Sequence, residues 1–153
     1  RAPRWSWEAA ALVRLGEHHA RRDQPAQAAS YLRTAALELD DAAACAAMAR
    51  LLVRNHDVVA PDERPYLRWY LFKAAASGSS EAAFYLGVLE MELARRGGPA
   101  AAAAAAAADH ERMGREWLAI ASQDKSQDMA RLLALYNGSD VLKVKVSDAI
   151  QKL

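Results

Sequence analysis

The sequence predicts an all-α protein, an α-solenoid of about three helix–turn–helix repeats. Alanine is the commonest of the 153 residues, and aromatic residues make up only 7%. Alanine is the strongest intrinsic helix former, and its small side chain lets helix axes approach closely. In addition, residues 70–87 read as the end of one helix, a turn at Gly78 and the start of a second helix. Weaker copies of this pattern lie on both sides, which predicts a helical repeat array.

The first third of the chain carries the apolar periodicity of three helices. A helix over about 5–22 turns Leu15 towards the interior. A second helix over 25–39 begins with proline, which is tolerated at the first helical position. Asp40 and Asp41 form a turn and an N-cap, and a third helix covers 42–54.

The middle of the chain contains the helical pair that defines the repeat. A loop over 55–61 precedes a helix over 62–77, which begins at an aspartate cap. Gly78 ends that helix, because glycine adopts positive φ without steric cost. The next helix covers 80–96, with Ser80 as its predicted N-cap.

The last third begins with a break at 97–99, followed by nine alanines over 100–108. The alanine run indicates a helical arm that touches a partner, a low-complexity insertion, or alanines that stand in for unassigned residues. Helices are predicted over about 109–122 and 126–136. The tail, 139–153, alternates in part like a strand, but a single strand would lack a partner, so a terminal capping helix is favoured.

One template relates the helical pairs, with an aromatic residue four positions before a small one and a large aliphatic residue directly before another small one. The small residues allow close helix packing, and the large ones fill the space beside them. The first type of pair is Tyr31 with Ala35, Tyr70 with Ala74, and Trp117 with Ala121. The second type is Leu15 with Gly16, Met48 with Ala49, Leu86 with Gly87, and Leu133 with Ala134. The array spans 1–138, divided into about 5–39, 42–96 and 109–138, with 97–108 as an alanine-rich insertion and 139–153 as a cap or tail.

This template resembles the SEL-like repeat family, which is related to the tetratricopeptide repeats. Lys73-Ala74-Ala75, Gly78 and Ala82-x-x-x-Leu86-Gly87 match the family pattern position by position. Ala11-x-x-x-Leu15-Gly16 matches its second half, and the other copies are degenerate. The resemblance covers about residues 9–138. It implies a right-handed superhelix that serves as a protein-binding scaffold and has no catalytic residues of its own.

Composition and charge limit the partners and the compartment. The net charge of +1 provides no overall field for nucleic acid or anionic membranes. The single cysteine, Cys45, excludes an intrachain disulfide and favours an intracellular, reducing compartment. No apolar run reaches the 18 residues typical of a transmembrane helix. The arginine-rich, acid-poor start without methionine is typical of an organellar presequence site, which favours the mitochondrion, with the cytoplasm as the alternative.

The sequence contains no pattern that indicates catalysis. It lacks nucleotide-binding and nucleophile-elbow motifs, and its four histidines and Cys45 do not have metal-ligand spacing. We therefore expect no catalytic, metal-binding or cofactor-binding residues and no enzymatic activity.

Three tryptophans are candidates for partner binding. Trp5 and Trp7 lie at the open N-terminal end of the predicted array, where an end helix must be capped or docked. Trp69 directly precedes Tyr70, so one of these two side chains must point away from the buried seam. Trp117 is expected to lie in the core because of its repeat position.

These observations favour a non-catalytic scaffold or structural subunit that binds other chains of a larger assembly. An RNA-binding helical repeat is one alternative, although the low net charge disfavours it. An enzyme subunit whose site forms only with a partner is the other.

Overall fold

The computed structural model describes the backbone of residues 4–55, 66–96 and 101–138; it leaves the side chains of 4–6, 101–103 and 138 undescribed. All regular structure in these ranges is helical, as predicted, and no strand occurs in them. The elements are α1 (Arg4–Arg21), α2 (Pro25–Arg33), the π-helical segment η1 (Thr34–Glu38), α3 (Ala42–Arg54), α4 (Leu67–Ala76), α5 (Ser80–Arg95), α6 (Ala101–Ser122) and α7 (Gln127–Gly138).

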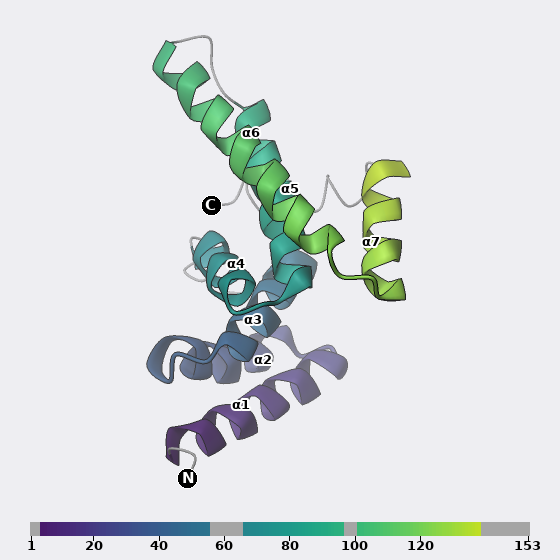
Figure 1. Cartoon of the computed structure of the whole chain (residues 1–153). Coiled ribbons are helices and arrows are strands. Elements are labelled where there is room, and N and C mark those ends of the chain that lie inside the picture. Colours follow the sequence, from purple (N-terminus) through teal and green to yellow (C-terminus); the bar gives the residue numbers. More distant parts are fainter. Residues whose placement is uncertain (1–3, 56–65, 97–100, 139–153) are drawn as a thin grey trace.

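The helices stack in chain order, each against the one before it (Figure 1). α5 and α6 form the most extensive contact, and this long pair projects away from the stack made by α1 to α4 (Figure 1). α1 also touches α3, and α3 touches α5. Packing therefore joins mainly neighbours along the chain. None of the helices described here is both long and apolar enough to cross a membrane.

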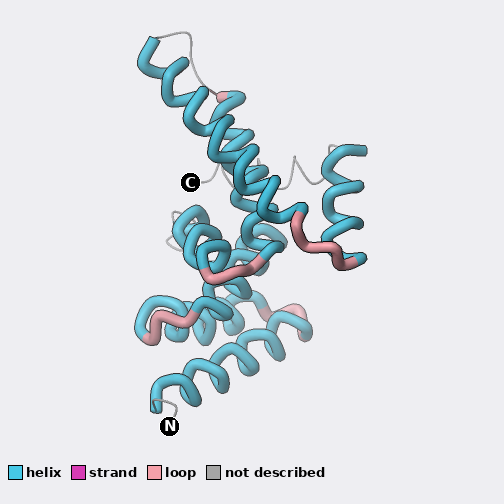
Figure 2. Tube along the Cα trace, in the orientation of Figure 1, coloured by secondary structure: helices cyan, strands magenta, loops and turns pink. Residues whose placement is uncertain are grey.

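Side-chain caps and a positive-φ glycine determine several helix ends. Short turns join α4 to α5 and α6 to α7 (Figure 2). The Asp41 carboxylate accepts a hydrogen bond from the Ala44 amide at 2.9 Å, which confirms the predicted cap of α3. Gly78 has a φ of +104°, as its role at the end of α4 requires. The predicted cap Ser80 is wrong by one residue, because the Ser79 hydroxyl accepts from the Ala82 amide at 3.2 Å.

The segment predicted as one helix over 25–39 changes its winding at Thr34. α2 ends at Arg33, and the π-helical η1 follows it. The Thr34 hydroxyl donates to the Ser30 carbonyl at 3.2 Å, a local bond that competes with regular helix geometry. Asp40 then takes a φ of +54° and forms an ion pair with Lys73, which ties this turn to α4.

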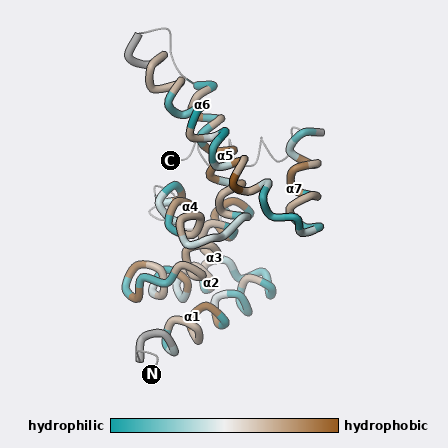
Figure 3. The backbone as a smooth tube through the Cα atoms, viewed as in Figure 1, coloured by the Kyte–Doolittle hydropathy of each residue, from teal (hydrophilic) through white to brown (hydrophobic). Residues whose placement is uncertain are grey.

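The core lies along α3 and α5. α5 has α4 on one side and α6 on the other, so it is buried almost all round. The connection between α6 and α7 is a clearly hydrophilic stretch (Figure 3). Most small residues of the repeat pattern are buried, among them Ala35, Ala74, Ala82 and Ala121, but Ala134 is exposed.

One expectation for the large repeat residues is wrong, and a second holds only in part. Leu15 is 43% exposed, whereas its counterparts Met48 and Leu86 are fully buried. α1 packs on α2 and α3 with the side of Gly16, which lies directly against Leu32, and Leu15 lies on the neighbouring, exposed face. Trp117, expected in the core, packs against the core but is half-buried. Among the remaining template residues, Tyr70 is buried, while Leu133 and Tyr31 are half-buried and Tyr31 stacks on His19.

The alanine run is not separate from the helix that follows it. α6 begins at Ala101 and continues without interruption to Ser122, so the predicted start at 109 is wrong. Alanine favours the helix, and nothing between Ala108 and Asp109 ends it. The predicted loop up to 61, the Asp62 cap, the break at 97–99 and the tail 139–153 lie outside the described residues.

Candidate interaction groove

A groove of about 450 Å³ lies between α4 and α6, with α5 beneath it. We call it the aromatic groove. α5 supplies the floor because it packs against both flanking helices. The lining side chains are Arg68, Trp69, Phe72, Leu86, Glu90, Met113 and Trp117.

α4 forms one wall of the aromatic groove with the face that points away from the core. Leu67, Tyr70 and Leu71 point into the core. Trp69 and Phe72, three residues apart, share the opposite face and are 39% and 55% exposed. The helix therefore presents large aromatic side chains on both faces, which a helix that serves only to fill a core does not need.

Ring contacts hold the exposed aromatic side chains in place. The Phe72 and Trp117 rings meet edge to face at 6.1 Å between centroids, so they link α4 to α6 across the groove. Lys73 Nζ lies 5.3 Å from the Trp69 ring centroid, in cation–π geometry. Trp69 also contacts the buried Tyr70 ring, at 5.4 Å between centroids. The apolar walls are therefore positioned before any partner arrives.

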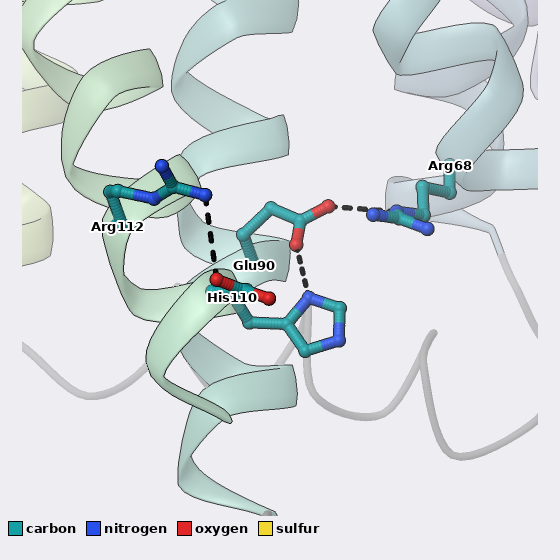
Figure 4. Close-up of polar contacts among 5 residues, drawn as sticks. Arg68, Glu90, His110 and Arg112 are labelled. Carbon is teal, nitrogen blue, oxygen red and sulfur yellow. Dashed lines mark hydrogen bonds and ion pairs between the residues drawn. The ribbon is translucent and has the colours of Figure 1, made fainter. Parts of the chain in front are cut away.

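A polar cluster at the groove connects three helices (Figure 4). Glu90 on α5 is only 2% exposed. Arg68 Nε on α4 donates to Glu90 Oε1 at 2.7 Å, and His110 Nδ1 on α6 lies 2.5 Å from Glu90 Oε2. A buried carboxylate needs such partners, because removal from water is costly for an unpaired charge. Beside it, Arg112 Nη2 pairs with Asp109 Oδ1 at 3.4 Å (Figure 4).

The structure separates the predicted tryptophans. Trp69 is exposed and lines the aromatic groove while Tyr70 is buried, which confirms that one of the two points outwards. Trp7 is 75% exposed but lies on α1, which α2 and α3 separate from α4 (Figure 1). The side chain of Trp5 lies outside the described residues.

Sequence reasoning missed several groove residues. Phe72 had a usable signal, since it follows Trp69 by three residues on a helix whose other face is apolar. His110 was expected at a helix start, but it lies within α6 and pairs with Glu90. Met113 carried no distinguishing signal.

The other groups that could carry chemistry in the described residues do not form a reactive site. Burial, with a smaller contribution from the Asp41 charge, raises the pKa of the Cys45 thiol to about 11, so the thiol is poorly nucleophilic. Among the described residues, no three histidine, cysteine or carboxylate side chains gather as metal ligands would.

A second cavity of about 240 Å³ is lined by Arg21, Arg50 and Arg54, with Glu17 among them. Arg21 and Arg54 end α1 and α3, where cations offset the helix dipole.

Comparison of the chain with models of protein families, with curated proteins and with solved structures gives no match in any of the three.

Proposed function

We propose that this chain is a non-catalytic protein-interaction module, a scaffold or structural subunit of a larger assembly, and that the aromatic groove is its binding site. The observation that carries the proposal is the exposure of Trp69, Phe72 and part of Trp117 around one open cavity. Exposed apolar surface costs about 25 cal/mol for each Å². Large aromatic side chains that remain accessible are the usual anchors of protein interfaces.

The repeat architecture belongs to this proposal. Stacking in chain order and buried alanines at the helix contacts support a short α-solenoid of the SEL-like type. In such an array the small residues set the helix spacing, and the surfaces between helices bind partners. A lone buried thiol, Cys45, fits the reducing compartment that we infer for the protein.

The charges at the groove favour a protein over RNA. Single-stranded RNA requires a basic channel beside its stacking platforms. Here Arg68 pairs with Glu90, Arg112 with Asp109, and Lys73 with Asp40. Each of these cations already has a carboxylate partner, so the groove lacks the continuous basic channel that a phosphate backbone requires, and apolar surface makes up most of its walls.

Site-specific photocrosslinking in cells of the source organism tests the proposal. The crosslinker p-benzoylphenylalanine replaces Phe72 in the tagged full chain, and the control replaces Ala43, an exposed residue of α3 outside the groove. We expect a discrete protein adduct from position 72 only, and its loss when Trp69→Ala and Trp117→Ala are added. Identical adducts from both positions, or none from position 72, would refute the proposed site.

A further inference from the structure

The aromatic groove also indicates what kind of partner fits it, an inference that rests on the proposed function. We infer that the occupant is an amphipathic α-helix of another protein. Its apolar face packs on Trp69, Phe72 and Trp117, and a carboxylate close to that face pairs with Arg68.

The helical form of the occupant follows from the walls. α4, α5 and α6 satisfy their backbone groups within each helix, and no strand occurs among the described residues. An extended peptide gains affinity by pairing with a free sheet edge, which these walls do not offer. A helix satisfies its own backbone and presents apolar side chains at every third or fourth position. A groove of about 450 Å³ has room for a few such side chains.

The carboxylate follows from the electrostatics at Arg68. Glu90 is buried, and its two oxygens are engaged by Arg68 and His110. Arg68 uses Nε for this contact, while half of its side chain remains exposed. The guanidinium carries further N–H donors in a rigid fork, which suits an incoming carboxylate.

Nearby charges do not reverse this preference. Among the described residues, Asp109 is an exposed carboxylate next to His110, and its pairing with Arg112 already gives it a counter-ion. A lysine in the occupant would bring an ammonium group next to the guanidinium of Arg68, which is repulsive. Glu90 holds Arg68 in position, so little side-chain entropy remains to be lost on binding.

Fluorescence anisotropy with three labelled peptides tests the inference on the full chain. The probes are amphipathic helices with leucine, phenylalanine and tryptophan at positions i, i+4 and i+7, identical except for Glu, Gln or Lys one turn from the anchors. We expect the Glu probe to bind about tenfold more tightly than the Lys probe and about threefold more tightly than the Gln probe, as for a partly exposed charge pair. Arg68→Gln should abolish the advantage of the Glu probe over the Gln and Lys probes, because the guanidinium is gone and the charge of Glu90 remains.

Arg115→Gln is the matched control, because Arg115 is an exposed arginine of α6 that pairs with Glu111 and does not line the groove. It should keep the preference of the wild type. A Glu probe with a central proline should bind at least tenfold more weakly, because proline breaks the helix. If circular dichroism shows that Arg68→Gln unfolds the chain, the wild type is measured at rising salt concentration instead. Screening by salt should then reduce the difference in affinity between the Glu and Lys probes.

The outcomes separate the two proposals. Binding that requires Trp69 and Trp117 but ranks the Glu, Gln and Lys probes equally would overturn the carboxylate inference and leave the proposed function standing. Equal binding of the proline probe would overturn the helical form. Absence of binding by all three probes, or binding unaffected by Trp69→Ala, would overturn the groove as a site. A homodimer that Trp69→Ala dissolves would show that a second copy is the occupant, and would overturn the inference of a foreign helix.

Discussion

Glu90 illustrates how one buried residue can join three helices. Arg68 and His110 each engage one of its oxygens, so removal of either partner leaves part of a buried charge uncompensated. We expect Arg68→Ala and His110→Ala each to lower the free energy of unfolding by about 1–3 kcal/mol, as measured by urea titration. In a Glu90→Gln background, each substitution should cost less than half as much, because the charge is gone. Equal costs in both backgrounds would show that these side chains contribute packing rather than charge compensation.

Cys45 is the second residue whose surroundings make a measurable difference. Burial, and then the charge of Asp41, raises the pKa of the thiol from 9.0 to about 11. The unfolded chain ionises first as the pH rises, so the contribution of the neutral thiol to stability is complete below pH 9 and is lost towards pH 11. Between pH 8 and pH 10, we expect the wild type to lose about 1 kcal/mol more than Cys45→Ala in urea titrations.

The comparison with Cys45→Ala removes the contribution of all other titrating groups, since they are common to both proteins. Native protein should also react slowly with iodoacetamide at pH 8, and protein unfolded in urea should react rapidly. Rapid alkylation of the native chain would place Cys45 at an accessible position and contradict its burial.

At the scale of elements, the crossing of α5 and α6 depends on two facing glycines. A Cβ on Gly87 would lie 2.7 Å from Leu118 Cγ and 3.1 Å from the Gly114 carbonyl oxygen. A Cβ on Gly114 would lie 3.0 Å from the Gly87 carbonyl oxygen. A backbone atom cannot turn aside as a side chain can, so an added methyl group must separate the helices.

We expect Gly87→Ala and Gly114→Ala each to lower the free energy of unfolding by about 1–3 kcal/mol in guanidinium titrations. This direction opposes helix propensity, which favours alanine over glycine by about 1 kcal/mol. Ala119→Gly, at an exposed position of α6, is the control and should lose about that amount. A stabilised Gly87→Ala variant would show that the two helices are further apart than described.

How far the sequence predicts these elements depends on whether the signal is local. The Asp41 cap and the positive φ of Gly78 were predicted because each depends on a few adjacent residues. Two consecutive serines could both cap α5, and the geometry after Gly78 selects Ser79 over Ser80. Gly87 was predicted as a small contact residue from the repeat template, whereas Gly114 lies outside that template.

The aromatic groove was predictable only in part for the same reason. Trp69 was identified because it adjoins Tyr70. The pairing of Glu90 with His110 depends on the register between α5 and α6. This register could not be read from the sequence, because the uniform alanine run at the start of α6 gives no mark of which residues face α5. The exposure of Leu15 depends on which face of α1 packs on α2 and α3, and the periodicity within α1 carries no such information.

At the scale of the whole molecule, stability should vary along the stack, because most contacts join neighbours in sequence. α3 and α5 have packed helices on more than one side, whereas α7 contacts α6 much less extensively than α5 does. α7 is anchored by the buried Met129 and by Tyr136, whose ring meets Phe84 edge to face at 5.9 Å. α7 is therefore the helix that should open most readily on its own.

We expect hydrogen–deuterium exchange to be fastest in α7 and slowest in α3 and α5, because local opening of α7 exposes little of the core. Tyr136→Ala should speed exchange across Gln127–Gly138 about tenfold or more, corresponding to a loss of about 1.5 kcal/mol or more from the aromatic pair and its burial. Exchange in α3 should stay unchanged. Leu135→Ala, at an exposed position of the same helix, is the matched control and should have little effect. If Tyr136→Ala speeds exchange equally in α3 and α7, the stack unfolds as one cooperative unit and α7 is integral to it.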